Sequence, residues 1–579
     1  MKRIIITYVL FMFGSYCIHG QYVLKNTDDV NWYSNIPQEQ VELKYNASLL
    51  FTGESMYYKV YCKNAKTKLF SNNSKIAYIE LIGNNGLVFR HKIRLENGIG
   101  QGDFFIPVSV RSGNYKLIGY TRWMLNGAVG NYYQADISIV NPYAKIDFVE
   151  HQEHDSANSD VELDPDQRIS LMTNKNAYGK RELVNLIIES NDVNAIGNYA
   201  ISVRKNDILD STIETSEFGQ QNSIEKSIVS EPKAIGETIY LPEFKGEMIT
   251  GSVTDKSTGN PVPSIEVALS VLSPEVIQDI TNTNSKGIFY FQITDHYRIP
   301  KALIQVVGDD RLDYVLEVDQ HESIDYTDLK FTELKFDANL KDAIIDRSVN
   351  NQIENAYISV KKDKIMAPDY PKPFFGNPMT TYKLDDYKRF KNVAETLDEV
   401  VDHAYHERRN GKTRYINVRE RESDPYYDVD ILPMVVVDGV SIQDHESILY
   451  YETKDVESMS VLRQEYYYGD KVYQGVLMIN TINNDYYKNL SGDYLKLVDL
   501  DSPQVGTDYF RQDYKTTTGL NRIPDQRMQL LWMPELELKE KRYQIQFFTS
   551  DNPGTYQIDL LGFTNSGELI SIKQSFIVD

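Results

Sequence analysis

The stretch Ser55-Met-Tyr-Tyr-Lys-Val-Tyr61 alternates between apolar and polar side chains. The same period of two returns in Ile76-Ala-Tyr-Ile-Glu-Leu-Ile82 and in Asn114-Tyr-Lys-Leu-Ile-Gly-Tyr120, and glycine-rich turns separate these segments. Such alternation between turns is typical of half-buried β-strands, and short strands at this spacing are typical of β-sandwiches. The sequence therefore predicts a mostly β protein that begins with a sandwich over residues 21–143.

Length and charge limit the number of domains and the classes of partner that this chain can have. The 579 residues are enough for roughly four domains of about 150 residues each. The formal net charge of -22 argues against nucleic acid as a partner and against adhesion to anionic lipid, because both need a basic surface. The 42 tyrosines fit many half-buried strands.

The first twenty residues have the pattern of a secretion signal. Lys2 and Arg3 precede a short apolar segment from Ile4 to Phe13, and cleavage is expected before Gln21. Cys17 is the one candidate for lipid attachment, although the bulky Tyr16 fits a lipobox poorly. Cys62 is then the single cysteine of the mature chain, expected as a buried thiol. No later apolar run reaches 18 residues, so no membrane-spanning helix is predicted.

A family resemblance extends the first prediction. The segment 21–143 resembles the MG2 macroglobulin domain, in the version found in large envelope proteins of Bacteroidota-type bacteria. The resemblance rests on Gly53-Glu54, Tyr78-Ile-Glu-Leu81, Gly100-Gln-Gly-Asp-Phe104, Gly113-Asn-Tyr115 and Tyr120-Thr-Arg-Trp-Met124. Residues 144–165 are polar and predict a linker. Residues 166–245 return to strands and predict a second macroglobulin-like sandwich.

The next segment has a sharper pattern. Gly251 to Val262 and Thr283 to Phe291 place glycine turns between strands, and residues 246–325 resemble the carboxypeptidase-regulatory-like domain, a small transthyretin-like sandwich. Residues 326–394 predict a connector of strand and helix. Helices are expected over 343–360 and 385–404.

Residues 395–485 resemble the plug domain of TonB-dependent outer-membrane receptors. The resemblance is carried by Leu432-Pro-Met-Val-Val-Val-Asp-Gly-Val-Ser441, Asp455-Val-Glu-Ser-Met-Ser-Val-Leu462 and Gly475-Val-Leu-Met-Ile-Asn-Thr481. No barrel-sized segment follows, and residues 490–579 predict a closing β-sandwich instead. The resemblance implies a fold suited to docking against envelope proteins, with Asp438-Gly439 as a tight turn.

The sequence predicts no catalytic residue, cofactor or metal site. Two histidine pairs are the candidates for a metal-dependent hydrolase: His151 with His154, and His403 with His406 on one helical face. Neither pair has an obvious third ligand, so solvated surface histidines are the simpler interpretation of both. Alternate acidic residues could bind calcium or could belong to a solvated linker: Asp160, Glu162, Asp164 and Asp166. Asp155-Ser-Ala157 and Asp210-Ser-Thr212 resemble O-glycosylation sites of Bacteroidota envelope proteins.

These observations predict an exported, non-enzymatic scaffold or binding subunit, in the periplasm or associated with the outer membrane. The expected partner is an outer-membrane barrel protein or its complex, contacted through strand edges and tyrosine-rich surfaces. A glycan- or peptide-binding protein is the first alternative, with an aromatic row of Trp123, Tyr132 and Tyr133. The metal-dependent hydrolase is the second.

Overall fold

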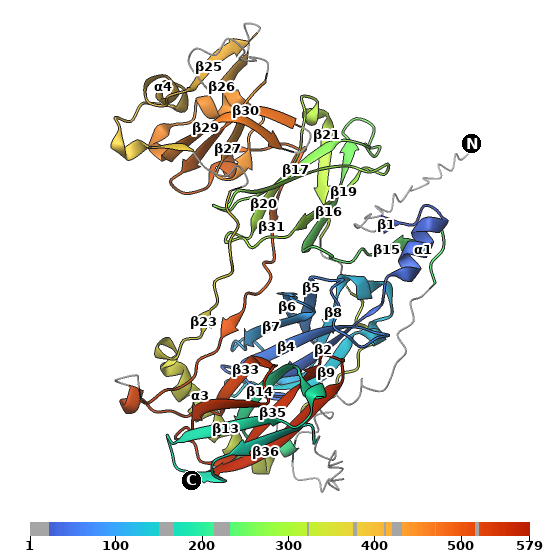
Figure 1. Ribbon diagram of the computed structural model, residues 1–579, viewed down its shortest axis with the longest axis vertical. Coiled ribbons are helices and arrows are strands. Elements are labelled where there is room, and N and C mark those ends of the chain that lie inside the picture. The colour runs from blue at the N-terminus through green and yellow to red at the C-terminus, as the bar shows by residue number, and fades with distance from the viewer. Residues whose placement is uncertain are drawn as a thin grey trace, which may run out of the picture.

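A computed structural model describes residues 22–146, 148–149, 167–212, 232–320, 324–373, 379–409, 413–419, 431–468, 471–515 and 520–579. Most elements are strands, which form three β-sandwiches and one smaller α+β unit (Figure 1). The predicted fold class, tandem sandwiches with one small α+β domain, is confirmed. None of the helices in these ranges has the length and apolar character that crossing a membrane requires. The predicted signal peptide and Cys17 lie outside the described residues.

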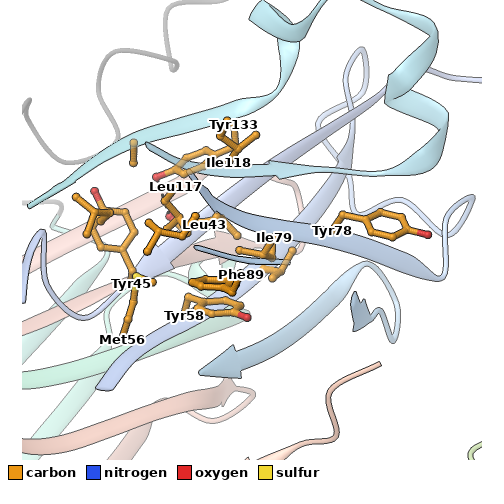
Figure 2. Close-up of a cluster of buried hydrophobic side chains, with 14 of the residues drawn as sticks. Leu43, Tyr45, Met56, Tyr58, Tyr78, Ile79, Phe89, Leu117, Ile118 and Tyr133 are labelled. Carbon is orange, nitrogen blue, oxygen red and sulfur yellow. Dashed lines mark hydrogen bonds between the residues drawn. The ribbon is translucent and has the colours of Figure 1, made fainter. Parts of the chain in front are cut away.

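The first sandwich occupies the predicted segment 21–143. A sheet of three strands has the order β2 (Glu39–Tyr45), β4 (Ser55–Asn64) and β7 (Ile99–Phe105). The facing sheet of five has the order β3 (Leu49–Phe51), β9 (Tyr133–Val140), β8 (Gly113–Tyr120), β5 (Ile76–Gly83) and β6 (Gly86–Arg94). Between them lies a core that includes Leu43, Met56, Tyr58, Phe89 and Leu117 (Figure 2). Strands β4 and β5 are buried along nearly their whole length, because both of their faces are covered, so the predicted half-buried strands are more deeply buried than expected.

The second sandwich is built from two distant parts of the chain. Its smaller sheet has the order β11 (Ile169–Thr173), β13 (Leu183–Ser190) and β34 (Arg542–Phe548). Its larger sheet has the order β12 (Ala177–Tyr178), β36 (Leu569–Val578), β35 (Gly554–Thr564), β14 (Gly197–Lys205) and β33 (Gln529–Leu538).

The prediction of separate sandwiches over 166–245 and 490–579 is therefore wrong. Strand β14 lies between β35 and β33 and pairs with both along most of its length. The physical reason is that alternation reports which face of a strand is buried and carries no information about its neighbour. Neither half has enough strands to cover its own core, so each completes the other.

The third sandwich follows the predicted segment 246–325 closely. One sheet has the order β19 (Ile288–Ile293), β16 (Glu247–Asp255) and β21 (Tyr314–Val318). The other has the order β18 (Ile277–Asn282), β17 (Glu266–Val271), β20 (Lys301–Val306) and β31 (Leu495–Asp499). Strand β31 comes from residues that the sequence assigns to the closing sandwich, so a returning segment completes this sheet.

The α+β unit includes the predicted plug-like segment and begins before it. Its sheet has the order β24 (Thr380–Lys383), β29 (Val456–Tyr468), β30 (Lys471–Thr481), β27 (Met434–Val437) and β28 (Val440–Ser441). It also holds the helices α4 (Val393–Glu399) and α5 (His445–Leu449) and the paired strands β25 (Ala404–Arg409) and β26 (Thr413–Val418).

Two local predictions have different outcomes in this unit. The tight turn at Asp438-Gly439 is confirmed, because both residues have positive φ and Val437 pairs with Val440 across it. The helix expected over 385–404 is much shorter. Regular helix covers only α4, and strand β25 already starts at Ala404, the last residue of the expected range. The resemblance of this unit to a receptor plug stays a prediction.

The connector 326–394 contains α3 (Lys341–Ala356), close to the helix expected over 343–360. Three two-residue strand pairs lie outside the larger sheets: β1 (Tyr22–Val23) with β15 (Thr238–Ile239), β10 (Phe148–Val149) with β22 (Phe336–Asp337), and β23 (Lys364–Ile365) with β32 (Thr507–Asp508). The remaining helices are α1 (Thr27–Asn35) and α2 (Ile208–Thr212). In Figure 1 the thin β23 segment joins an upper lobe, formed by the third sandwich and the α+β unit, to a lower lobe formed by the first two sandwiches and α3.

Buried ionisable groups occupy the contacts between these parts. Lys59 of β4 reaches the second sandwich, where it donates to the Tyr199 carbonyl at 3.0 Å, and its burial lowers its pKa to about 7. Between the lobes, the buried Glu243 accepts from the Tyr78 hydroxyl at 3.1 Å and from the Met248 amide at 2.9 Å. Burial raises the pKa of Glu243 to about 7. The domain contacts are therefore hydrogen-bonded and sensitive to pH as well as apolar.

Candidate binding site

Helix α3 buries polar side chains beside the apolar Ile344, and it exposes two apolar side chains, Ile345 and Val349. Arg347, Asn351 and Asn355 recur at a spacing of four, which places them on one face of the helix. Arg347 is only 3 % exposed, whereas Ile345 and Val349, on other sides of the helix, are 48 % and 47 % exposed. Charged side chains such as Arg347 are seldom so buried on a surface helix unless they are paired.

The buried face of α3 holds the turn between β3 and β4. Asn351 donates to the Thr52 carbonyl at 2.8 Å, Asn355 to the Gly53 carbonyl at 3.0 Å, and Arg347 to the Leu49 carbonyl at 3.0 Å. Gly53 has a φ of 91°, and a Cβ there would lie 2.7 Å from the amide nitrogen of Asn355. The turn therefore requires glycine, both for its backbone conformation and for the close approach of the helix.

A buried ion pair joins three parts of the lower lobe. Nε and Nη2 of Arg347 each donate to one oxygen of the Glu54 carboxylate at 2.9 Å, and Arg204 of β14 contacts the same carboxylate at 3.2 Å. Burial alone would raise the pKa of Glu54, but the two arginines outweigh it and lower that pKa to about 2. Glu54 thus links the first sandwich to α3 and to the second sandwich.

A second charged cluster fixes the end of the helix. Glu354 accepts from Lys361 at 2.7 Å, and Lys361 also lies 3.4 Å from Asp525. Asp525 is held by Arg527 at 2.7 Å, and although burial opposes its ionisation, Arg527 brings the Asp525 pKa well below its usual range. Because both clusters are satisfied internally, they position α3 and leave few of their charges for a ligand.

A cavity of about 200 Å³ lies between α3 and the two sandwiches. Aromatic rings form one wall: Tyr57 stacks on Trp532 with centroids 6.1 Å apart, and meets Tyr509 edge-on at 4.7 Å. Phe105 and Ile358 also line it, and they are 46 % and 53 % exposed, so they mark its mouth. The cavity combines aromatic surface with the amides of α3, which suits an amphipathic group.

The pair His403 and His406 does not form part of a metal site among the described residues. His403 lies in the turn before β25 with a φ of 67°, and His406 lies within β25, where its Nε2 is 3.2 Å from Asp398. The predicted shared helical face is therefore wrong, because the chain has already entered a strand. Within the described ranges, no three His, Cys, Asp or Glu side chains converge as metal ligands. His151, His154 and the acidic series Asp160, Glu162, Asp164 and Asp166 lie outside those ranges.

The aromatic row is also wrong. Trp123, Tyr132 and Tyr133 are 0 %, 4 % and 3 % exposed, and the Trp123 indole donates to the Pro37 carbonyl at 3.2 Å. These side chains belong to the core and its edge. The prediction failed because aromatic residues at this spacing occur both in buried strands and in exposed aromatic rows, and the sequence alone does not distinguish the two. Cys62 is buried as predicted, and burial raises the pKa of its thiol.

The proposed glycosylation sequences have no clear outcome. Asp155-Ser-Ala157 lies outside the described residues. Asp210-Ser-Thr212 ends α2, and the Asp210 carboxylate lies 3.6 Å from Arg347. A binding role for α3 was not predicted from the sequence. The signal was available in the spacing of Arg347, Asn351 and Asn355 beside apolar Ile345 and Val349.

Comparison with known proteins leaves the chain without an assigned family. No protein-family model and no curated protein matches it. A similar solved structure is Escherichia coli α2-macroglobulin activated by porcine elastase, at 9 % identity over 93 % of this chain and 44 % of that one, with a TM-score of 0.23. Salmonella α2-macroglobulin reacted with methylamine is 8 % identical over 97 % of this chain and 40 % of that one, with a TM-score of 0.24. Dimeric latent PorU from Porphyromonas gingivalis is 12 % identical over 49 % of this chain and 34 % of that one, with a TM-score of 0.15.

The chain thus spans less than half the length of the α2-macroglobulins it resembles. At these TM-scores the likeness assigns neither a family nor an activity. The class of protein that the structure itself defines is a multidomain β-sandwich protein with one α+β unit.

Proposed function

We propose that this protein is a non-enzymatic scaffold of the bacterial envelope, which binds another protein through the outer side of α3. The observation that carries the proposal is a group of exposed apolar side chains, called here the α3 surface: Ile345, Val349, Ile358, Val360 and Ile365. Their exposed fractions run from 47 % to 67 % within one short segment. Neighbouring exposed apolar residues of this kind mark interaction sites in soluble proteins.

The internal contacts of α3 support this interpretation. The helix is held in place by Arg347, Asn351 and Asn355, so its outward apolar residues are not needed to fix it to the lobe. A partner that covers this apolar surface would gain about 25 cal/mol of binding free energy for each Å² that it removes from water. A fixed helix also loses little conformational freedom on binding, which favours affinity.

A strand edge offers a second contact of the predicted kind. Strand β36 pairs with β35 along its whole length, whereas its pairing with β12 covers only Ile577 and Val578 within the described residues. Edges of this type accept an added strand from a partner. The partner we favour is an outer-membrane barrel protein or its complex, as the plug-like sequence suggests, and the site of action is the periplasm or the outer membrane. The proposal involves no cofactor.

Co-purification in a gentle detergent tests the proposal. Tagged protein from its native cells should recover an outer-membrane protein at stoichiometric levels. The double variant Ile345→Glu/Val349→Glu should lose it, because charges would be buried in the contact. The matched control Val193→Glu/Leu312→Glu changes two apolar residues that are 80 % and 63 % exposed elsewhere, and should retain it. Recovery without an outer-membrane protein, or equal recovery by both variants, would refute the proposal.

A further inference from the structure

The cavity beside α3 contains hydrogen-bond donors that lack acceptors. Trp532 and Arg204 both line it, and Trp532 is 2 % exposed. Trp532 Nε1 and Arg204 Nε are buried and have no hydrogen-bond partner among the described residues. Buried donors in folded proteins nearly always have a partner, which can be a protein group, a water or a ligand. An acceptor oxygen inside the cavity would satisfy this wall.

The charged side chains of the lining favour a neutral ligand. Each cation is already in an ion pair: Arg204 and Arg347 with Glu54, Lys361 with Glu354, and Arg527 with Asp525. The remaining carboxylate, Asp363, accepts from the Phe510 amide at 2.7 Å and has no ion-pair partner within the described ranges, so it disfavours an anion. The buried donors of the opposite wall disfavour a cation. A neutral ligand is also unaffected by the chain's net charge of -22.

The ligand must both donate and accept hydrogen bonds. Asn350 of α3 and Gln526 also line the cavity, and neither side chain forms a hydrogen bond in the part of the chain that the structure describes. A carboxamide donates through its nitrogen and accepts through its oxygen. Together with the Trp532 donor and the Asp363 carboxylate, these amides provide partners for hydroxyl groups, which also have both functions.

The size and the aromatic wall of the cavity indicate a single ring. A volume of about 200 Å³ is far larger than the roughly 30 Å³ of one water, yet smaller than the roughly 300–1,000 Å³ of sites for drug-sized molecules. Tyr57 in the wall and Phe105 at the mouth supply aromatic surface. A sugar ring matches this lining, because its C–H faces pack on aromatic rings while its hydroxyls point outward from the rim.

We propose that this cavity binds one neutral hexose ring, either as a free sugar or as the terminal unit of a glycan. The ring lies against Tyr57 and Phe105. Its oxygens accept from Trp532 Nε1 and Arg204 Nε, and a hydroxyl donates to Asp363. The site goes beyond the scaffold proposal, and neither proposal depends on the other.

NMR of the indole N–H groups of the full chain tests the inference. The three tryptophans give three indole signals, and Trp532→Phe assigns the signal of Trp532 by its loss. The probes are glucose, galactose and mannose, each as the free sugar and as its methyl glycoside. At least one probe should shift the Trp532 signal with a dissociation constant of about 1 mM, which is the affinity expected for so small a ligand. Equal binding of both forms assigns the end of a glycan, and binding of the free form alone assigns a free sugar.

Matched variants locate the binding, which saturation-transfer difference NMR measures without the indole signal. Phe105→Ala should weaken it by about tenfold, whereas Phe244→Ala, which removes a ring that is 39 % exposed elsewhere, should leave it unchanged. Trp532→Phe keeps an aromatic ring but loses the N–H donor, and should also weaken binding by about tenfold. Its control is Trp32→Phe, at a tryptophan that is 40 % exposed.

Several results would overturn the inference: no probe shifts the Trp532 signal, or Phe105→Ala binds as well as Phe244→Ala does. N-Acetyltyrosine amide is the counter-probe. If it binds and no sugar does, the cavity takes a peptide side chain and the sugar site is refuted. Phe105 is 46 % exposed, so its variant keeps the test valid even if Trp532→Phe disturbs folding.

Discussion

Replacing Arg347 by methionine should loosen α3 from the lower lobe. The substitution keeps much of the side-chain volume and removes the charge that holds Glu54, whose carboxylate then retains Arg204 and the Phe51 amide, each at 3.2 Å. Removing one partner of a buried ion pair costs about 3–5 kcal/mol. The lowering of the Glu54 pKa from 4.5 to about 2 gives a similar figure, about 3 kcal/mol at 1.36 kcal/mol per unit.

The pH dependence makes this prediction specific. Because the folded-state pKa of Glu54 is depressed, its contribution to stability is fully present above pH 4.5 and is lost as the pH falls from 4.5 towards 2. The difference in unfolding free energy between wild type and Arg347→Met should therefore be large at pH 7 and should shrink in acid. Glu54→Gln should make the loss of Arg347 less costly, because no buried charge is then left unpaired.

Urea unfolding at pH 7 and pH 3, with hydrogen exchange of the α3 amides, measures the effect. The exposed pair Lys454 and Glu452 provides a control, since Lys454→Met should leave unfolding unchanged. A change below about 1 kcal/mol at pH 7, or the same change at both pH values, would refute the assignment of Glu54 and Arg347 as the link that holds α3.

Other parts of the molecule give further tests. Gly53→Ala should lower stability by about 1–3 kcal/mol in thermal unfolding, and more than Gly259→Ala, whose φ is also positive but whose Cβ would meet nothing within 4 Å. Lys59 has a depressed pKa, so the unfolded chain binds more protons, and wild type should gain stability relative to Lys59→Met as pH rises from 7 towards 10.5; a flat difference would contradict this. Glu243 has a raised pKa, so wild type should lose about 3 kcal/mol relative to Glu243→Gln between pH 4.5 and 7, and unfolding curves that stay parallel would count against it. The isolated fragment 490–579 should show no cooperative unfolding by circular dichroism, because it lacks β14.

The sequence was sufficient for properties that depend on neighbouring residues. Alternation over 55–61 and 76–82 predicts β4 and β5, and Asp438-Gly439 predicts its turn, because side-chain period and backbone preference are local. The sequence was insufficient where the structure depends on pairing between segments that are far apart in the chain. The pairing of β14 with β35 depends on which strands meet after collapse, and nothing local distinguishes those partners.

The candidate site was harder to predict for the same reason. Arg347 looks like an ordinary surface charge in the sequence, and its burial depends on Glu54, which lies 293 positions earlier. His403 and His406 have helical spacing, but their segment becomes a strand beside β26, and tertiary pairing overrode the local pattern. The burial of Arg347 on α3 follows from this long-range ion pair.

The second sandwich also determines the order in which the parts of this chain can fold during synthesis. Asn185 on β13 and Gln546 on β34, joined by a hydrogen bond in the finished sheet, are 361 positions apart. At about 5–20 residues per second of synthesis, the first half waits roughly 20–70 seconds for its missing strands. During that wait, the upper lobe can form whole while β13 and β14 keep open edges that invite aggregation. The unfinished sheet is therefore the part of the second sandwich that is most open to aggregation until the last strands arrive.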